Sequence, residues 1–259
     1  MNVIRKVIQN KLHQLGYKKV YQYPSMREKP ESLFEPSFEN VLGAYFYQLS
    51  NFRFIQIGAN DGIADDKLRK FVNFYNMHGI LIEPQADVFQ SLKQNYCNTS
   101  HNLYFENCAI GVKDGELKLY RLKSQFANLI SEDYAYLRDK NLSTVFASHD
   151  PQHIKNHLDF NKIKNLKDEL FLESLAVPMY TIDRICEKYA WNNFELLMID
   201  TEGYDYEILK SINLKKYTPR VISFEHVHLS FNEREAAIKL LVSNDYKINI
   251  DSMDVTASK

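Results

Sequence analysis

The residues with the clearest chemical meaning are two closely spaced glycines and a glutamate that follows them along the chain. A short apolar run, residues 54–57, leads into the turn Gly58-Ala-Asn-Asp-Gly62, and a second apolar run ends at Glu83. Glycines let a backbone approach a ligand closely, and an acid at the second strand end of a βαβ unit can accept both hydroxyls of a ribose. The pattern therefore predicts a site for a cofactor that contains adenosine.

The spacing of the glycines indicates which kind of cofactor fits. Dinucleotide sites carry the pattern G-x-G-x-x-G, in which a helix N-terminus packs against the pyrophosphate. Here the glycines read Gly58-x-x-x-Gly62, and Asn60 stands where the middle glycine should be. A cofactor without phosphate, such as S-adenosylmethionine, fits this turn better.

The elements that position these residues alternate between strand and helix patterns. We expect strands at residues 54–57, 80–82, 103–110, 116–120, 195–199, 221–224 and 246–250, and helices at 64–77, from 84, from 204, and at 232–243. The turn Lys113-Asp-Gly115 suggests a hairpin between the strands on either side of it. Such alternation predicts a mostly parallel, doubly wound α/β sheet that binds ligands at the carboxyl ends of its strands.

Two further segments accompany this domain. Residues 1–50 are expected to be an N-terminal helical extension, and residues 51–259 the cofactor-binding domain. Within that domain, residues 121–176 contain no convincing strand, and a long segment between core strands is usually a functional insertion. We interpret it as a helical lid that recognises the acceptor; packing without ligand contact is the alternative. An apolar stripe within residues 3–12 suits a helix docked on the core or on a partner in a homodimer.

Composition limits the partners and the compartment. The chain has 259 residues with 32 basic and 33 acidic ones, so no general attraction to nucleic acid is expected. No apolar stretch is long enough to span a bilayer, and the N-terminus lacks the apolar core of a signal peptide. Three scattered cysteines, Cys97, Cys108 and Cys186, suit reduced thiols. We expect a cytoplasmic protein without a membrane span.

Together these landmarks resemble the FkbM family of S-adenosylmethionine-dependent methyltransferases. The matching segments are Gly58-Ala-Asn-Asp-Gly62, Glu83-Pro84, Cys108-Ala-Ile-Gly111, Asp114-Gly115, Thr181-Ile-Asp183, Asp200-Thr-Glu-Gly-Tyr204 and Phe224-Glu225-His226. The resemblance covers roughly residues 52–230. It implies a class I methyltransferase (Rossmann-like) fold, with strand order 3-2-1-4-5 and added strands, and O-methylation of a hydroxyl group.

The resemblance also implies a set of residues that bind the cofactor. These are Gln56, Gly58, Asn60, Asp61, Gly62, Glu83, Cys108, Ala109 and Asp200. The family usually has an aspartate where this chain has Gln56, and that acid commonly holds the ammonium group of the cofactor. Gln56 can still accept a hydrogen bond, but without charge assistance. Either another acid replaces the aspartate or cofactor affinity is reduced.

Acids after the fourth and fifth parallel strands suggest how the acceptor hydroxyl loses its proton. In the implied strand order, Asp200 and Glu225-His226 end neighbouring strands, so these three side chains could share a Mg²⁺ or Mn²⁺ ion. Catechol O-methyltransferase is similar in this respect. In a metal-free version, Asp200 holds the amino group of the cofactor and His226 is the general base. A purely structural role is the third interpretation.

Other polar residues near these strand ends have weaker assignments. Glu202 is a third acid or a helix-start residue, and we interpret His228 as a support for the site. A helix is expected to start at Asp150-Pro151, which puts His153 and His157 on one face, where they could bind zinc. Without a nearby cysteine or an HExxH glutamate, contact with solvent or acceptor is favoured.

The sequence thus predicts an O-methyltransferase that acts on a sugar, either a nucleotide-sugar or a precursor of bacterial surface polysaccharide. The bacterial source is suggested only by frequent Lys, Asn and Ile. Methylation of a base or amine is disfavoured, because no Pro-Pro follows Asp200. A binding scaffold without catalysis is a further alternative, motivated by Gln56.

Overall fold

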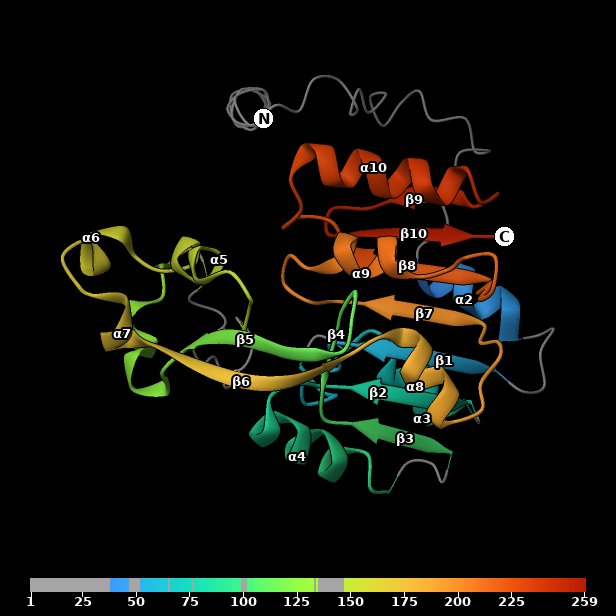
Figure 1. The fold of residues 1–259 in the computed structure, drawn as a ribbon, viewed down its shortest axis with the longest axis horizontal. Helices are drawn as coiled ribbons and strands as arrows, with labels where there is room; N and C mark the ends of the chain where they lie inside the picture. Colours follow the sequence, from blue (N-terminus) through green and yellow to red (C-terminus); the bar gives the residue numbers. More distant parts are fainter. Residues whose placement is uncertain are drawn as a thin grey trace, which may run out of the picture. The chain divides into compact units, whose positions relative to one another are not determined.

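The structure is a computed structural model. It describes residues 38–46, 52–64, 66–75, 77–98, 102–132, 134 and 147–259. A seven-stranded sheet lies at the centre of this described part. The strand order is β3-β2-β1-β7-β8-β10-β9 (Figure 1). In this order the strands are Leu103–Glu106, His78–Ile82, Arg53–Ile57, Leu196–Ile199, Val221–Glu225, Asp254–Ser258 and Lys247–Ile250. The strands β3, β2, β1, β7 and β8 pair in parallel, and β10 is antiparallel to both of its neighbours, β8 and β9.

Helices cover both faces of this sheet because the parallel strands are apolar on both sides. All four residues of β7 are buried, as is usual for a strand between two helical layers. The helices are α2 (Phe38–Phe46), α3 (Arg69–Phe74), α4 (Ala86–Asn95), α8 (Ile182–Lys188), α9 (Asp205–Ser211) and α10 (Phe231–Val242). Helices α2, α3 and α4 pack on one face, and α8, α9 and α10 on the other. The predicted doubly wound, mostly parallel α/β fold is confirmed.

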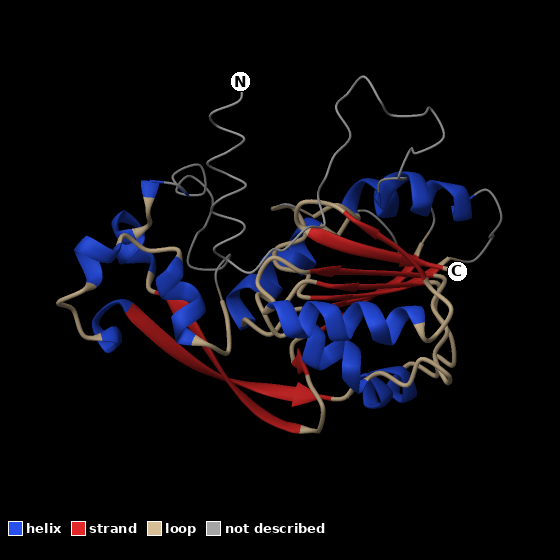
Figure 2. Ribbon diagram, turned by 90° about the horizontal axis from the view of Figure 1, so that it is seen from above, coloured by secondary structure: helices blue, strands red, loops and turns tan. Residues whose placement is uncertain are grey.

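A second, three-stranded sheet carries the lid. It contains β4 (Ala109–Ile110), β6 (Leu172–Tyr180) and β5 (Gly115–Leu122), in that order. Strands β5 and β6 form a long antiparallel ribbon whose far end bears short helices (Figures 1 and 2). Among the described residues, these helices are η1 (Ser124–Leu129), α5 (Pro151–Asn156), α6 (Phe160–Ile163) and α7 (Asp168–Phe171).

The described residues 123–132, 134 and 147–171, which lie within the predicted lid of residues 121–176 and are called the lid below, have an apolar core of their own. Its buried residues are Leu129, Ile130, Ile154, Leu158, Ile163 and Phe171, which pack with Leu122 and Leu172 at the ends of the ribbon. The two strands therefore carry a separately packed unit beyond the carboxyl ends of the parallel strands (Figure 1).

The structure corrects the predicted hairpin. Strand β5 does not pair with residues 103–110; it pairs with β6, which begins inside the segment predicted to lack strands. The side chain of Asp114 accepts a hydrogen bond from the Thr181 backbone N–H at 3.0 Å, so this turn is held against the end of β6. Residues 103–110 divide into β3 and β4, which belong to different sheets.

Two element boundaries also differ from the prediction. The helix expected over residues 64–77 is confined to α3, because Asp66 Oδ1 accepts hydrogen bonds from the backbone N–H groups of Leu68 and Arg69 and the helix starts there. Strand β10 was not predicted; its segment is short and follows a polar turn.

The N-terminal prediction falls largely outside the described residues, which omit 1–37 and 47–51. Helix α2 is described, and its Phe38, Val41 and Leu42 are buried in the core of the main domain. Among the described helices, none has both the length and the apolar character needed to cross a membrane.

Candidate functional site

A cleft of about 1150 Å³ opens at the carboxyl ends of β1, β2, β7 and β8. The turn after β1 and the end of β2 line one part of it, and the ends of β7 and β8 line another. Three lid histidines, His149, His153 and His157, complete the lining on the side of α5. The fold therefore brings predicted cofactor-binding residues, such as Gly58 and Glu83, to the same cavity as the acids at the ends of β7 and β8.

The turn after β1 requires its glycines. Gly58 has a φ of +78°, and a Cβ there would lie 1.7 Å from the backbone oxygen of Asp200. Gly62 has a φ of +70°, and a Cβ there would meet the ring of Tyr96 at 2.4 Å. Asn60, also with positive φ, lines the cleft together with Gly58. Close packing of the turn, rather than ligand space alone, explains both glycines.

Asp61 stabilises the same turn from outside the described cleft lining. Its Oδ1 accepts hydrogen bonds from the backbone N–H groups of Ile63 and Ala64, both at 2.8 Å. Asp61 and Gly62 therefore shape the turn, and Gly58 and Asn60 form its surface toward the cleft.

Glu83 lies at the end of β2 and is held by the backbone around it. Its Oε2 accepts a hydrogen bond from the Asn60 N–H at 3.0 Å, and its Oε1 accepts one from the Gln85 N–H at 2.9 Å. Only 3% of the residue is exposed, and burial raises the pKa of its carboxyl to about 7 in spite of these bonds. The backbone therefore fixes the position of the Glu83 carboxyl, and its burial brings its pKa close to neutral pH.

Gln56 precedes the turn, one residue before the end of β1. Its Nε2 donates to Asp66 Oδ1 at 3.3 Å, and its Oε1 is buried without a hydrogen-bond partner among the described residues. Both side chains line the cleft. An acid therefore stands beside the amide that replaces the expected aspartate. On the far side of Glu83, Cys108 and Ala109 are buried and also line the cleft.

Three carboxyl groups gather where β7 and β8 end. Asp200 follows β7, Glu225 is the last residue of β8, and Glu202 lies in the turn after Asp200 with a φ of +53°. Burial, followed by the charges of its neighbours, raises the pKa of Glu225 and that of Glu202 well above their usual range. So much negative charge in one buried place favours protons or a bound cation.

The two histidines after β8 have different surroundings from those predicted. His226 is 6% exposed and its Nε2 donates to the backbone oxygen of Asp251 at 3.0 Å; it is not among the residues that line the cleft. His228 lies there instead, with Nε2 3.4 Å from Glu202 Oε2 and 3.5 Å from Glu225 Oε2. The structure brings Asp200 and Glu225 to the cleft but does not add His226 to them.

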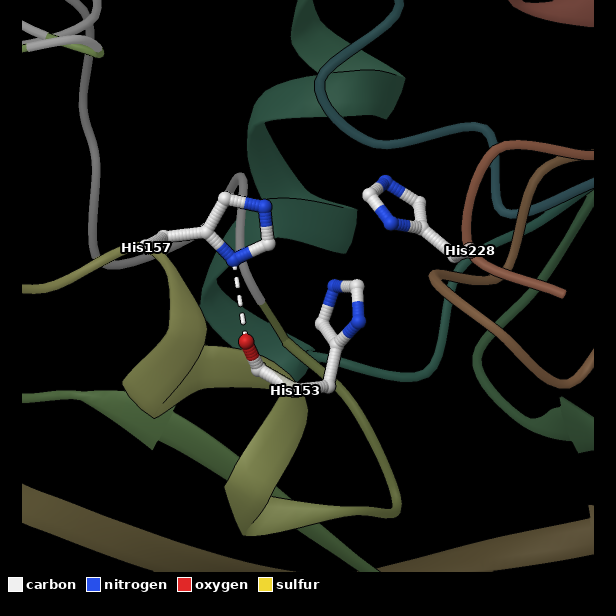
Figure 3. A group of neighbouring side chains, drawn as sticks. All are labelled: His153, His157 and His228. Carbon is white, nitrogen blue, oxygen red and sulfur yellow. Dashed lines mark hydrogen bonds between the residues drawn. The ribbon is translucent and has the colours of Figure 1, made fainter. Parts of the chain in front are cut away.

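Two lid histidines meet His228 across the cleft. Figure 3 shows the rings of His153, His157 and His228 grouped together. The ring centroids of His153 and His228 are 4.4 Å apart. His153 Nε2 donates to Glu202 Oε2 at 2.8 Å, and His157 Nδ1 donates to the His153 backbone oxygen at 3.0 Å. Burial lowers the pKa of His157 to about 4 and that of His228 to about 3, so both rings are uncharged at neutral pH.

The start of α5 explains how the lid histidines are positioned. Asp150 Oδ1 accepts a hydrogen bond from the Gln152 N–H at 2.9 Å and Pro151 follows it, as predicted for a helix start. The spacing of four then places His153 and His157 together. His149 precedes the helix and packs instead on the ring of Tyr204. Sequence reasoning missed the link of this pair to Glu202 and His228, for which the only signal was their position after two strands.

The chain matches the family model described as the Methyltransferase FkbM domain over residues 56–248. Among solved structures, it is similar to a methyltransferase FkbM from Methylobacillus flagellatus KT, with 13% identity and a TM-score of 0.48 over 80% of this chain and 44% of that one. It is also similar to a precorrin-6y C5,15-methyltransferase from Geobacter metallireducens GS-15, with 12% identity and a TM-score of 0.37 over 92% and 100% of the two chains. The chain thus spans less than half of the first of these proteins. A comparison with curated protein sequences finds no match.

Proposed function

Because this chain belongs to the FkbM methyltransferase family, we propose that it transfers a methyl group from S-adenosylmethionine to a hydroxyl oxygen of a sugar. The observation that carries the proposal is the Glu83 carboxyl, which is held at the end of β2 by the Asn60 N–H. An acid in this place, beside a glycine turn and at the edge of a large cleft, is suited to a ribose diol.

In the proposed complex, the ribose of the donor lies against Glu83, and its adenine lies beside Cys108 and Ala109. Asn107 fixes this side of the site, because its Nδ2 donates to the backbone oxygens of Glu83 and Pro84 at 2.8 and 3.0 Å. The methionine part then follows the turn Gly58–Gly62 towards the end of β7. In this arrangement the adenine, the ribose and the methionine part lie one after another along the cleft, from the end of β3 to the end of β7.

The ammonium group of the donor is proposed to lie near Gln56. The buried Oε1 of Gln56 is an acceptor, and the Asp66 carboxylate next to it supplies negative charge. Asp66 would thereby provide the charge that an aspartate at position 56 supplies in the family, and Asp200 adds to it from the end of β7.

The acceptor hydroxyl is proposed to approach between Asp200 and Glu225. Its oxygen forms a bond to the methyl carbon as the bond from carbon to sulfur breaks, and the electron pair of that bond stays on the departing thioether. The proton of the hydroxyl passes to a carboxylate of this pair. A carboxyl whose pKa is raised by burial, as that of Glu225 is, is a stronger base once it is ionised than an exposed one.

The sequence suggests two other ways to remove the proton of the hydroxyl, a shared metal ion and a His226 base. Both require His226 to lie in the cleft. A Mg²⁺ or Mn²⁺ ion shared by Asp200, Glu225 and His226 does not fit, because His226 is not among the described residues that line the cleft, and the histidine grouped with Glu225 is His228. Its place outside this lining also keeps His226 from the position of a general base. We therefore assign no step to this metal site.

The cleft supports a sugar acceptor of considerable size. Ligand sites usually occupy about 300–1000 Å³, and this one of about 1150 Å³ extends from the donor residues to the lid. We propose that the lid recognises a nucleotide-sugar or a surface-polysaccharide precursor, in a cytoplasmic setting that suits the free thiols of Cys97, Cys108 and Cys186.

The test combines binding with turnover. Calorimetry of the full chain with S-adenosylmethionine should show one site, and incubation with a panel of nucleotide-sugars should give a product heavier by one methylene unit. Donor binding without transfer to any sugar would favour a binding scaffold. Transfer to an amine with no product from any hydroxyl would overturn the proposed reaction.

A further inference from the structure

We propose that His153, His157, His228 and Glu202 form a binding site for a divalent transition-metal ion of the zinc type, which joins the lid to the carboxyl edge of the main sheet. This ligand set is distinct from the Asp200, Glu225 and His226 set rejected above. The proposal concerns metal binding and is independent of the methyl-transfer reaction.

The distances suit one coordination sphere. The ligand atoms of the three histidines lie within 4.8 Å of one another. Glu202 Oε2 lies 2.8 Å from His153 Nε2 and 3.4 Å from His228 Nε2. A tetrahedral zinc ion with bonds of about 2.0–2.1 Å places its ligand atoms about 3.3 Å apart. An ion at this place therefore requires the imidazole rings to rotate toward one another.

The chemistry of the donor set selects the metal. Three imidazole nitrogens and one carboxylate oxygen suit zinc and similar transition metals, whereas Mg²⁺ and Ca²⁺ prefer oxygen ligands alone. The hydrogen bond from His157 Nδ1 to the His153 backbone oxygen makes Nε2 the nitrogen that His157 offers to an ion. A backbone acceptor on the second ring nitrogen is the usual way in which a metal-binding histidine is oriented.

The ligands come from two parts of the fold that meet at this point. His153 and His157 belong to the lid, while Glu202 and His228 follow β7 and β8. A second contact supports the junction, because Ser148 Oγ of the lid segment donates to the Glu202 backbone oxygen at 2.9 Å. Glu202 holds a left-handed backbone conformation, a strained state that persists where surrounding contacts fix it.

Four protein ligands fill a tetrahedral zinc site, as in structural rather than catalytic centres. The expected effect of the ion is therefore to fix the lid over the cleft. Glu225 lies next to the site, since its Oε2 is 3.5 Å from His228 Nε2, and a bound ion would reduce the accumulated negative charge there.

The experiment measures metal binding on the full chain without donor or acceptor. A Cys97→Ser background removes the exposed thiol, which could bind zinc by itself. The chelator-stripped protein is titrated with ZnCl₂ by calorimetry, and bound metal is counted by mass spectrometry. We expect one zinc per chain, and an affinity lower by about 100-fold or more in His157→Gln and in His228→Gln.

The matched control is His149→Gln. This histidine lies in the same lid segment and lines the same cleft, but it is outside the group of three. Its substitution should leave zinc affinity unchanged. No zinc binding by the wild-type chain, or equal binding by all the variants, would overturn the proposal.

Footprinting keeps the test decisive if a variant fails to fold. Diethyl pyrocarbonate modifies accessible histidines. The side chains of His153 and His228 are 10% and 21% exposed, so zinc should protect these two in the wild-type chain but not His149. Modification of His153 and His228 that is the same with and without zinc would contradict the site. Because neither measurement uses turnover, failure of the methyl-transfer proposal would leave both readings unchanged.

Discussion

The carboxylate of Glu83 accepts a hydrogen bond from the backbone N–H of Asn60 at 3.0 Å, so the acid at the end of β2 and the turn after β1 are fixed relative to each other. A ligand that binds one of them meets the other in a set place. The first two predictions follow from this contact.

Replacing Glu83 by Gln should weaken the binding of S-adenosylmethionine by about 10- to 150-fold, the equivalent of about 1.5–3 kcal/mol for hydrogen bonds to a charged group. The amide can accept one ribose hydroxyl but lacks the second acceptor oxygen. Calorimetry measures the effect. Asp87→Asn is the control, because this nearby acid pairs with Arg121 and does not line the described cleft. Equal affinities for the Glu83 variant and the wild-type chain would remove Glu83 from the donor site.

The affinity for adenosine should increase with pH. The pKa of Glu83 is raised to about 7, and the ionised form is the one that accepts two hydroxyls. Protonation below that value therefore competes with binding, and affinity should rise about tenfold from about pH 6 to about pH 8 and then level off. Adenosine is chosen because it lacks the titrating amino group of the methionine part. The dependence should disappear in Glu83→Gln; a pH profile that persists there would come from another group.

Gln56→Met should separate the two ends of the donor. The change removes the buried Oε1 at similar size, so affinity for S-adenosylmethionine should fall about tenfold, as expected for one hydrogen bond to a charged group. Affinity for adenosine, which has no ammonium group, should not change. Parallel titrations with the two ligands give the comparison, and an equal loss for both would place Gln56 near the adenosine instead.

Gly58→Ala should lower the free energy of unfolding by about 3 kcal/mol or more. Its Cβ would overlap the Asp200 backbone oxygen, and its positive φ disfavours any side chain. Gly43→Ala is the matched control, because nothing lies within 4 Å of a Cβ at this position of α2. That change should instead stabilise the protein by about 0.5–1 kcal/mol. Denaturant unfolding of both variants tests the contrast.

Turnover should depend on the acids at the ends of β7 and β8. Asp200→Asn and Glu225→Gln should each lower kcat by about 10²- to 10⁴-fold, the usual contribution of a general base. His226→Gln should keep most of the activity, because His226 is not among the described residues that line the cleft. Glu207→Gln, an acid on α9 that pairs with Lys210, serves as the control. An inactive but folded His226 variant would restore that residue as the base.

Local patterns in the sequence were sufficient for the parallel strands of the main sheet, but not for its antiparallel strand β10. The fully apolar run of β7 and the Asp150-Pro151 helix start depend on residues that are neighbours in the chain, and both appear in the structure where the pattern places them. The pairing of β5 with β6 depends on a return of the chain after a long insertion, which no local signal specifies. The turn at Asp114 instead suggested that β5 pairs with residues 103–110, which lie just before it in the chain.

The candidate site also has one part that local sequence patterns predict and another that only the tertiary fold brings together. The positions of Glu83 and Gly58 follow from strand ends and turns, so sequence spacing was enough to place them at the cleft. The contact of His153 with Glu202 and His228 forms only because the lid folds back over β7 and β8. The direction of the His226 ring depends on the turn that precedes β10, a strand that the sequence did not reveal.

The apolar core inside the lid has a practical consequence for redesign. Since the tip of the ribbon packs on itself, its apolar residues can be exchanged as a set, provided that His153 and Ser148 keep their contacts with Glu202. A tip redesigned in this way should change which acceptor the proposed enzyme takes, while the residues of the proposed donor site stay in place.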